Sequence, residues 1–510
     1  MKFLSVSYAY HDGNMAYYDN GKVYYTKWER TTQRKRSTYP NDWEWMYEAK
    51  RLWDVNLEDL DDIVIDFEPT FLYTEQGIKI RGHADSLPYQ YRKIYSGESL
   101  AEQLDDHPFY NIKKIWFLNH HYLHALSSLE DSDIQIVIDG GGLNAAWTVF
   151  KNDSIIGRAY LDSGSFGTIW EELAEKFGVA ANPPQDAAGK FMALQAYGNT
   201  DREFLIFLKK FSYKELNVIT NYDNWIAYKK DHTLADLTKI DWLKTIYKRM
   251  GECILEIFQE FTSSRDDKIV YSGGVAQNII WNTKLKRHFP NLIIPPHCSD
   301  EGLSLGGIEF LRRKYNLPKL VLDNFPYIQS DISVDKPLSD VIKYTAKLLQ
   351  EGKVVAWYQG NGEIGPRALG NRSILIDPRV PDAKNKVNSI KKRENYRPFG
   401  VSILKDYAEE YFMYEAEDYY MQYTCIPKKY FPEVTHVDNT CRVQFVDDRN
   451  LVFKQLLEEF YKLTGFPMLL NTSLNQAGKP LAGYPENAKD LFYENKNLDA
   501  VIIGNTVHLR

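Results

Sequence analysis

The sequence predicts an α/β protein of two domains, of which the first repeats one α/β unit to form two lobes. Three observations support this. The chain has 510 residues, more than one hydrophobic core usually accommodates, and a strand–turn–hairpin pattern occurs twice. A proline-containing segment without periodicity precedes a further α/β region. Hydrophobic residues make up 44% of the chain and aromatic residues 14%, which is sufficient for cores in both domains.

The repeated pattern begins at the N-terminus. Residues 2–28 contain an apolar strand (FLSVSYAY), a polar turn at His11-Asp12-Gly13, a strand (MAYY), a hairpin turn at Asn20-Gly21 and a strand (KVYYTKW). Residues 135–160 repeat that order as IVID, three glycines, AAWTVF, an Asn-Asp turn and SIIGRAY. Two such lobes would enclose a cleft that suits a nucleotide.

A third strand and turn (KIVYSGGVAQN) leads into a helix that begins near Gln277. Beyond Tyr315 the segment NLPKLVLDNFPYIQSDISVDKP loses periodicity and reads as a crossover between domains. A second α/β pattern runs from about Leu338 to the C-terminus. We therefore place the first domain at residues 1–325 and the second at residues 335–510.

Composition excludes few partners. The formal net charge of -7 gives no global attraction to nucleic acid or anionic membranes, although local basic clusters could still bind them. No apolar run approaches the roughly 18 residues of a membrane span, and the N-terminus lacks a signal-peptide pattern. The four cysteines form no CxxC pair, which fits a reducing compartment. We expect a cytoplasmic protein.

The segment NHHYLHALSSL places His120 and His124 four residues apart, so on a helix both imidazoles lie on one face and could share a metal. Alone, this spacing more often reflects two solvated or hydrogen-bonded histidines. Asp300, before a glycine-rich helix start in HCSDEGLSLGG, could be a third ligand or a helix cap. His121 points elsewhere and is expected to be structural or to support the ligands.

Two glycine-rich turns, after Asp139 and after Ser272, could bring backbone amides close to phosphates. Neither turn matches a Walker or dinucleotide pattern, and tight turns explain each equally well.

The C-terminal half carries a less common arrangement of basic residues in GPRALGNRSILIDPR and IKKRENYRPFG. Gly-Pro and Arg-Pro-Phe turns fix the backbone beside them, which suits bidentate capture of a phosphate or carboxylate better than a solvated surface. The candidates are Arg367, Arg372, Lys391, Lys392, Arg393 and Arg397. The segments THVDNTCRVQ and NTSLNQAGKPL add Arg442 and Asn471 in polar turns, for which caps are the simpler interpretation.

In their order, these motifs resemble the carbamoyltransferase family of nodulation and antibiotic-tailoring enzymes over nearly the whole chain. The matching segments are His11-Asp12, HHYLHA, VIDGGG, GKFMALQAYG, SGGVAQN, SDEGLSLGG, GEIGPRALGNRSILIDPR, IKKRENYRPF, THVDNTCRVQ and NTSLNQAGKPL. The resemblance implies an N-terminal Kae1-like domain with the actin-like ATPase fold and a C-terminal YrdC-like domain. The second would form carbamoyl-adenylate from carbamoyl phosphate and ATP, and the first would transfer the carbamoyl group to an acceptor hydroxyl.

The resemblance also implies site residues. His120, His124 and Asp300 would bind a divalent metal, with iron(II) expected, and Mg²⁺ would accompany ATP. Carbamoyl phosphate would be bound by Arg367, Lys391, Arg397, Arg442 and Asn471. The nucleotide in the first domain would be bound by Asp139, Gly140, Gly142, Gly273, Gly274 and Asn278. His11, beside Asp12, is the candidate general base or orienting group at the acceptor hydroxyl, where a near-neutral pKa would suit proton transfer.

Two departures from the family pattern leave the acceptor open. Gly13-Asn14 follow the His-Asp pair where the family usually has Ala-Ser, and QDAAGKFMALQA displaces a carboxylate of the family's DEGKVMGLA-like segment. A sugar, a metabolite and 5-hydroxymethylcytosine in DNA are all compatible acceptors. For DNA, the phosphate contacts would come from Arg34, Lys35 and Arg36, and the stacking from Trp43 or Trp45. The competing interpretation is a solvated surface or pocket wall.

Three other functions compete with this interpretation. An actin-like kinase or ATPase would use the first domain alone and leave the basic C-terminal half without a purpose. A tRNA threonylcarbamoylation-like enzyme would use the same two domain types, but the combined motifs are those of hydroxyl carbamoyltransferases. A non-catalytic binding protein would not need the full set of ligands and arginines. The sequence is compatible with a homodimer but does not decide the oligomeric state.

Overall fold

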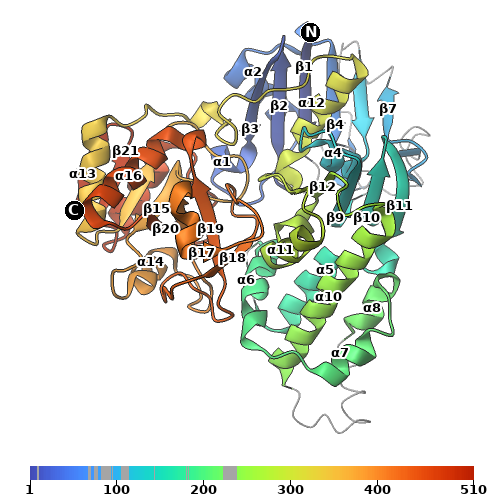
Figure 1. Cartoon of the computed structure of the whole chain (residues 1–510). Helices are drawn as coiled ribbons and strands as arrows, with labels where there is room; N and C mark the ends of the chain where they lie inside the picture. The colour runs from blue at the N-terminus through green and yellow to red at the C-terminus, as the bar shows by residue number, and fades with distance from the viewer. Residues whose placement is uncertain are drawn as a thin grey trace.

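The computed structural model describes residues 1–8, 11–66, 71–73, 79–81, 93–94, 96–104, 114–142, 144–179, 181, 183–221 and 238–510. These residues form two α/β lobes and a C-terminal α/β region that lies beside them (Figure 1). In this described part of the chain, no helix combines the length and apolar character needed to cross a membrane.

The first lobe is built on a six-stranded sheet in the order β3-β2-β1-β4-β8-β7. Its strands are β1 (Lys2–Ser7), β2 (Asn14–Asp19), β3 (Lys22–Lys27), β4 (Asp62–Asp66), β7 (Ala101–Leu104) and β8 (Ile115–Leu118). The first three strands are antiparallel, and β4 and β8 continue the sheet in parallel with β1. Asn20 (φ 47) and Gly21 (φ 101) form the predicted hairpin turn, because both adopt the positive φ that such a turn requires.

The second lobe repeats this order in a five-stranded sheet, β11-β10-β9-β12-β13. Its strands are β9 (Ile134–Gly142), β10 (Ala145–Lys151), β11 (Ser154–Tyr160), β12 (Ile269–Ser272) and β13 (Leu292–Ile293). Again three antiparallel strands are followed by parallel ones. The predicted duplication is therefore confirmed, and with it the actin-like arrangement of the first half of the chain.

Two helices pack against each other and against the two sheets. Helix α4 (His120–Leu126) contacts β9 and β10, and α12 (Leu303–Lys314) contacts β1, β2 and β4. The glycines of the SDEGLSLGG motif make this packing possible. A Cβ on Gly306 would overlap the backbone of Leu123, and one on Gly307 would overlap the side chain of Ser5. The motif therefore brings Asp300 close to α4.

The remaining helices of the first two lobes lie around the sheets. They are α1 (Trp28–Thr32), α2 (Asp42–Trp53), α5 (Phe166–Lys176), α6 (Ala187–Leu194), α7 (Arg202–Leu208), α8 (Leu216–Ile219), α10 (Lys239–Phe261) and α11 (Ile279–His288). A small two-stranded sheet joins β5 (Phe71–Tyr73) and β6 (Lys79–Arg81). Trp170, Tyr247 and Trp281 stack between α5, α10 and α11 in the core of the second lobe.

The C-terminal region contains a nine-stranded mixed sheet, β17-β18-β19-β16-β20-β15-β14-β21-β22. Its strands are β14 (Val355–Tyr358), β15 (Arg372–Ile376), β16 (Gly400–Leu404), β17 (Phe412–Met413), β18 (Thr424–Pro427), β19 (Cys441–Val446), β20 (Met468–Ser473), β21 (Ala500–Ile503) and β22 (Thr506–Leu509). Its helices are α13 (Ser339–Gln350), α14 (Ala383–Lys391), α15 (Ala408–Tyr411), α16 (Leu451–Thr464) and α17 (Pro485–Glu494). The predicted second α/β pattern thus lies in this sheet, whereas the exact boundary near residues 325–335 stays a prediction.

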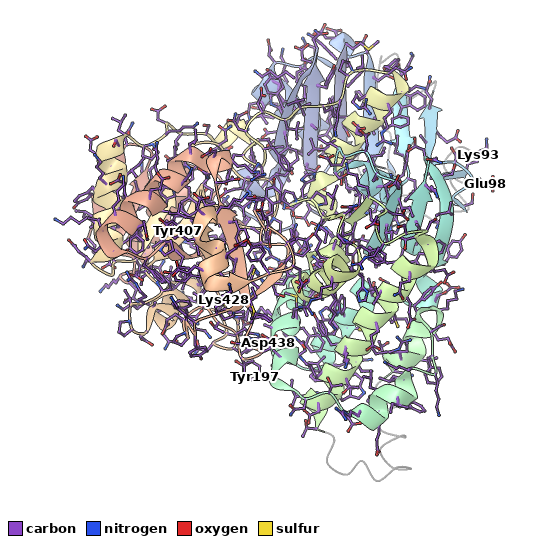
Figure 2. The ribbon with its side chains drawn as sticks, in the orientation of Figure 1. Lys93, Glu98, Tyr197, Tyr407, Lys428 and Asp438 are labelled. Carbon is purple, nitrogen blue, oxygen red and sulfur yellow. The ribbon has the colours of Figure 1, made fainter. Side chains whose placement is uncertain are left out.

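The C-terminal region touches both lobes. At its boundary with the second lobe, Figure 2 shows Tyr197 and Asp438 close together, and the rings of Tyr197 and His436 are 5.9 Å apart. Thr283 of α11 also meets Thr424 of β18 at 3.0 Å. On the side of the first lobe, Arg30 of α1 donates to the backbone oxygen of Gly365 (3.1 Å). These contacts bring three parts of the chain around one central space.

Candidate active site

A cavity of about 920 Å³ lies where the two lobes and the C-terminal region meet. Most of the residues predicted to act in metal, nucleotide or carbamoyl phosphate binding line it, although they come from distant parts of the sequence. These residues are His11, Asp12, His120, Asp139, Gly140, Gly142, Gly274, Asn278, Asp300, Arg367, Lys391, Arg397, Arg442 and Asn471. One cavity therefore joins the acidic, histidine-containing wall of the lobes to the basic wall of the C-terminal region.

The predicted pair of histidines lies on α4, as its spacing required. Asn119 caps this helix by accepting a hydrogen bond from the backbone N–H of Tyr122 (3.2 Å), and the rings of His120 and His124 are 4.8 Å apart. Asp300 precedes α12, and its Oδ1 lies 3.3 Å from Nε2 of His124 and 3.8 Å from Nε2 of His120. The structure thus brings the three predicted ligands together.

Asp139 joins this cluster, although the sequence suggested that it contacts the nucleotide. Its Oδ2 lies 3.7 Å from Nε2 of His120, and its Oδ1 accepts a hydrogen bond from the backbone N–H of Gly274 (2.6 Å). Candidate ligand atoms of His120, His124, Asp139 and Asp300 all lie within 4.8 Å of one another. The sequence placed Asp139 at the end of a strand but could not show that this end faces α4.

The cluster fits a divalent transition metal. Nε2 of His120 and both ring nitrogens of His124 are buried and make no hydrogen bond of good geometry within the described residues. Asp66 lies 3.2 Å from Nδ1 of His120 and itself accepts from the hydroxyl of Ser7 (2.9 Å), which fixes the imidazole with Nε2 toward the cluster. Two imidazoles with carboxylates are a donor set typical of iron, zinc and related ions.

The charge of the cluster supports the same conclusion. Burial by itself lowers the pKa of His120, but Asp66, Asp139 and Asp300 together raise that pKa well above its usual value. The buried carboxylates therefore hold a positive charge between them, which a bound metal ion would supply in place of a proton.

His11 and Asp12 form the wall next to this cluster. Nδ1 of His11 lies 3.0 Å from Oδ2 of Asp12 and 3.3 Å from Oδ2 of Asp300. Burial lowers the pKa of His11, but the two carboxylates outweigh burial and raise it to about 9. The two carboxylates thus move the pKa of His11 away from the near-neutral value expected from the sequence, which could not show that they face its ring.

Asp12 is held by a buried lysine. Nζ of Lys27 lies 2.9 Å from Asp12, 3.0 Å from Glu29 and 2.7 Å from Glu301. Burial raises the pKa of Asp12, but Lys27 together with His11 and Arg36 brings it well below the usual value. Asp12 is thus an ionised anchor. The sequence analysis did not identify three residues of this ion-pair network, Lys27, Glu29 and Glu301, because their sequence pattern does not distinguish them from charged surface residues.

The basic stretch that was predicted to bind DNA phosphates behaves differently. Lys35 pairs with Asp186, and Arg36 pairs with Asp12 (3.2 Å) and Asp186 (3.4 Å), so both side chains face the cavity. Arg34 remains exposed. Trp45 is 0% exposed and packs in the core of the first lobe, so it cannot stack on a base, whereas Trp43 is 63% exposed. Of the residues expected to contact DNA, the structure thus contradicts the stacking role of Trp45.

The glycine-rich turns differ in their roles. Gly140, Gly142 and Gly274 line the cavity. Gly273 does not: its N–H donates to the backbone oxygen of Cys298 (2.7 Å), and at φ 93 a Cβ would overlap the backbone of Ile138. The structure thus gives Gly273 a structural role, and its contact with the nucleotide stays a prediction.

Asn278 lines the cavity at the N-terminus of α11. Its side-chain oxygen caps this helix by accepting from the backbone N–H of Trp281 (3.2 Å) and also accepts from the hydroxyl of Tyr247 (2.7 Å). These two bonds fix the end of α11 against the cavity wall.

The opposite wall of the cavity is a cluster of cations formed by Arg367, Lys391, Arg393, Arg397 and Arg442. Burial, followed by repulsion from neighbouring arginines, lowers the pKa of Arg393 and Arg442 well below the usual value, and burial also lowers that of Arg367. None of these three arginines has an ion pair within the described residues. A half-buried charge without a carboxylate partner is costly, so the cluster fits an anion.

Several members of the basic motifs take unexpected positions. Arg393 belongs to the cation cluster, as the basic motif suggested, although the family resemblance had not included it in the carbamoyl phosphate site. Arg372 instead stacks on Tyr358 at 3.6 Å and donates to the backbone oxygens of Gln359 and Ile332, both at 2.6 Å. Its predicted anion binding is therefore wrong, because its strand points it into the core.

Lys391 and Asn471 complete the basic wall. Nζ of Lys391 donates to the backbone oxygens of Ser473 (2.6 Å) and Asn475 (3.1 Å), and burial lowers its pKa well below the usual value. The amide nitrogen of Asn471 donates to Ser402 (2.8 Å), while its buried side-chain oxygen has no partner in the part of the chain that is described. The wall thus offers a fixed lysine and a free amide oxygen beside the arginines.

Comparison with known families gives two matches that together cover most of the chain. Residues 2–308 match the family described as "Carbamoyltransferase N-terminus", and residues 346–510 match the one described as "Carbamoyltransferase C-terminus". The matched regions contain the histidine cluster and the cation cluster, respectively.

Several curated proteins are similar to the chain. The nodulation protein NolNO of Sinorhizobium fredii is 29% identical over 443 residues, which are 77% of this chain and 63% of NolNO. The 3'-hydroxymethylcephem-O-carbamoyltransferase of Amycolatopsis lactamdurans is 28% identical over 419 residues, 76% of this chain and 78% of that enzyme. An uncharacterized protein of Methanocaldococcus jannaschii is 29% identical over 462 residues, 82% and 71% of the two chains.

Solved structures show weaker similarity. HypF of T. kodakarensis aligns with 62% of this chain and 48% of its own, at 16% identity and a TM-score of 0.40. Sua5 of P. abyssi aligns with 34% of this chain and 50% of its own, at 16% identity and a TM-score of 0.25.

Proposed function

The chain belongs to the carbamoyltransferase family, and from this premise we propose that it is an ATP-dependent O-carbamoyltransferase with two half-reactions in one cavity. The first forms carbamoyl-adenylate from carbamoyl phosphate and ATP, and the second carbamoylates an acceptor hydroxyl. The observation that carries the proposal is the shared cavity, whose lining holds both the cation cluster and the cluster of histidines and carboxylates.

The cation cluster suits the activation step. Carbamoyl phosphate and ATP both carry negative oxygens, and Arg367, Arg393 and Arg442 have no carboxylate partners that would compete for these oxygens among the described residues. Guanidinium groups bind phosphate oxygens in a bidentate manner, and in a site shielded from water their charge stabilises the transition state strongly. Because carbamoyl-adenylate is labile in water, a cavity shared with the second site would protect it during transfer.

The lobe wall suits the transfer step. His120, His124, Asp139 and Asp300 would hold a divalent ion, expected to be iron(II), which supplies Lewis-acid polarisation of a carbonyl when bound. His11 lies beside Asp300 and is partly open to the cavity. Nδ1 of His11 lies 3.0 Å from Oδ2 of Asp12, which fixes the direction of the ring, so we propose that His11 orients the acceptor hydroxyl.

Gly140, Gly142, Gly274 and Asn278 are the proposed adenylate contacts. Gly140 has open space where a Cβ would stand, so its backbone could approach a phosphate closely. ATP would enter with Mg²⁺. The glycines lie on the same cavity as the histidine cluster, which would keep the adenylate next to the transfer site.

We propose a small molecule as the acceptor. A volume of about 920 Å³ falls in the range of small-ligand sites. The hydroxymethylcytosine alternative loses support from the pairing of Lys35 and Arg36 with acidic residues and from the burial of Trp45. A kinase that uses the lobes alone would leave the cation cluster without a ligand.

The test is an acceptor panel analysed by mass spectrometry. Oligosaccharides, a 3'-hydroxymethylcephem, and single- and double-stranded oligonucleotides with 5-hydroxymethylcytosine are incubated with enzyme, ATP, carbamoyl phosphate and Fe²⁺. We expect one small-molecule acceptor to gain a single carbamoyl group, only when ATP and carbamoyl phosphate are both present. Transfer of a phosphoryl group without carbamoyl phosphate would instead identify a kinase, and a carbamoylated nucleoside would return DNA as the acceptor.

A further inference from the structure

The turn that carries His11 is braced by a short basic loop. Gln33, at the end of α1, and Arg36 both adopt a left-handed backbone conformation, with φ of 53 and 54. The backbone N–H of Arg36 donates to Glu29 (2.9 Å), and its carbonyl oxygen accepts from the N–H of Asp12 (3.2 Å). Such conformations are unfavourable for residues with a Cβ and persist only where the surroundings fix them. The loop therefore contains local backbone strain, and its hydrogen bonds hold Arg36 beside the turn that carries His11.

The side chain of Arg36 connects the two lobes. Its Nη1 lies 3.2 Å from Oδ2 of Asp12, the same oxygen that Nδ1 of His11 approaches at 3.0 Å. Its Nε lies 3.4 Å from Oδ1 of Asp186, which ends the short 3₁₀ helix Pro184–Asp186 in the second lobe. Asp186 also pairs with Lys35. A single guanidinium thus contacts a carboxylate of each lobe.

This geometry makes the position of His11 depend on Arg36. Oδ1 of Asp12 contacts Lys27, so Oδ2 is the oxygen of Asp12 that contacts the imidazole, and it lies nearer to Nδ1 of His11 (3.0 Å) than Oδ2 of Asp300 does (3.3 Å). The planar fork of an arginine presents its N–H donors in fixed directions toward two carboxylates, whereas the ammonium group of a lysine imposes no such fixed geometry. In QDAAGKF a carboxylate stands displaced from the family pattern, and this displaced residue, Asp186, makes the second contact.

We propose that Arg36 is a positioning residue for carbamoyl transfer, which orients the Asp12–His11 pair toward the acceptor hydroxyl and ties that orientation to Asp186 of the second lobe. The inference rests on the proposed transfer reaction at His11. Arg36 lies outside the cation cluster and has its own carboxylate partners, so it acts on transfer and leaves activation unchanged.

Kinetics of both half-reactions test this role. In Arg36→Gln, kcat for transfer to the acceptor found in the panel should fall roughly ten- to hundredfold, because small displacements of an orienting group have effects of that size. The KM for that acceptor and carbamoyl-phosphate-dependent pyrophosphate release should stay within about twofold. The kcat of Arg36→Lys for transfer should lie between those of Arg36→Gln and wild type. The kcat of Asp186→Asn should also fall, but by less than that of Arg36→Gln.

Arg312→Gln is the matched control, because Arg312 pairs with Glu309 (2.7 Å) on α12 and does not line the cavity. A readout without turnover completes the test. The imidazole nitrogen chemical shifts of His11, assigned with a His11→Gln variant and recorded on protein loaded with diamagnetic Zn²⁺, should change in Arg36→Gln and stay unchanged in Arg312→Gln.

The outcomes separate this inference from the proposed function. Unchanged His11 shifts in Arg36→Gln, or equal losses of pyrophosphate release and transfer, would overturn the positioning role. Wild-type transfer in Asp186→Asn would overturn the link to the second lobe. If wild type carbamoylates no acceptor while the His11 shifts still depend on Arg36, the proposed reaction fails and the structural coupling stands.

Discussion

Replacing Arg442 should make the ligand-free protein more stable and the enzyme less active. Arg442 lies on β19 in the cation cluster, and it has no ion pair within the described residues. Burial lowers its pKa well below the usual value, and repulsion from Arg367, Arg393 and Arg397 lowers it further. Because an arginine stays charged at neutral pH, this strain is present in the folded protein as an unfavourable free energy.

The two effects have opposite signs and can be estimated separately. Arg442→Gln removes one half-buried charge without an ion pair, which we expect to raise the free energy of unfolding by about 1–3 kcal/mol, at the low end of the cost of such charges. The same change removes a charged hydrogen bond to the bound anion. That loss should weaken carbamoyl phosphate binding by about 1.5–3 kcal/mol, or roughly ten- to hundredfold.

Thermal unfolding with and without carbamoyl phosphate measures both effects. Ligand-free Arg442→Gln should unfold at a higher temperature than wild type, but carbamoyl phosphate should stabilise the variant less, because stabilisation by a ligand follows its affinity. Arg312→Gln, which breaks a paired arginine instead, should not gain stability. A destabilised Arg442→Gln, or one that carbamoyl phosphate stabilises as strongly as wild type, would refute the assignment of the cluster as an anion site.

Three further predictions follow from the structure. The His120→Ala variant should contain less bound metal, as measured by plasma mass spectrometry. It should lose carbamoyl transfer but keep pyrophosphate release. Full transfer by a variant that binds no metal would contradict the metal site. Gly142→Ala should also lower metal content, because a Cβ there would overlap the ring of His120, whereas Gly189→Ala, at an open position in α6, should not. Burial raises the pKa of Asp331 from 3.8 to about 6. Above about pH 6 the carboxylate is ionised in the folded protein, which lowers the free energy of unfolding. This destabilisation disappears as the pH falls toward 4, because the folded protein then binds the proton. Asp331→Asn should therefore raise the free energy of unfolding near pH 8 by up to about 3 kcal/mol and have little effect near pH 4, as denaturant titrations at both pH values would show.

Local signals in the sequence were sufficient for much of the fold. The hairpin turns at Asn20-Gly21 and at residues 152–153 are determined by side chains that tolerate positive φ, so both lobes could be located before any long-range contact was known. The spacing of His120 and His124 determined their common face on α4, because a helix returns to that face every four residues. The family resemblance then identified Asp300 as a third candidate metal ligand. Sequence spacing alone could not show that Asp300 lies near these histidines.

What the sequence by itself determined is the order of strands, turns and helices and the residue types available for chemistry, because these depend on neighbours along the chain. The tertiary structure alone decided which side chains meet. It brought Asp139 to the histidines, turned Arg36 toward Asp186 and directed Arg367 into the cavity while Arg372 entered the core. The physical reason is that these contacts depend on how separate strands and helices pack. Residues with the same local sequence pattern can therefore face the solvent, the hydrophobic core or a binding site.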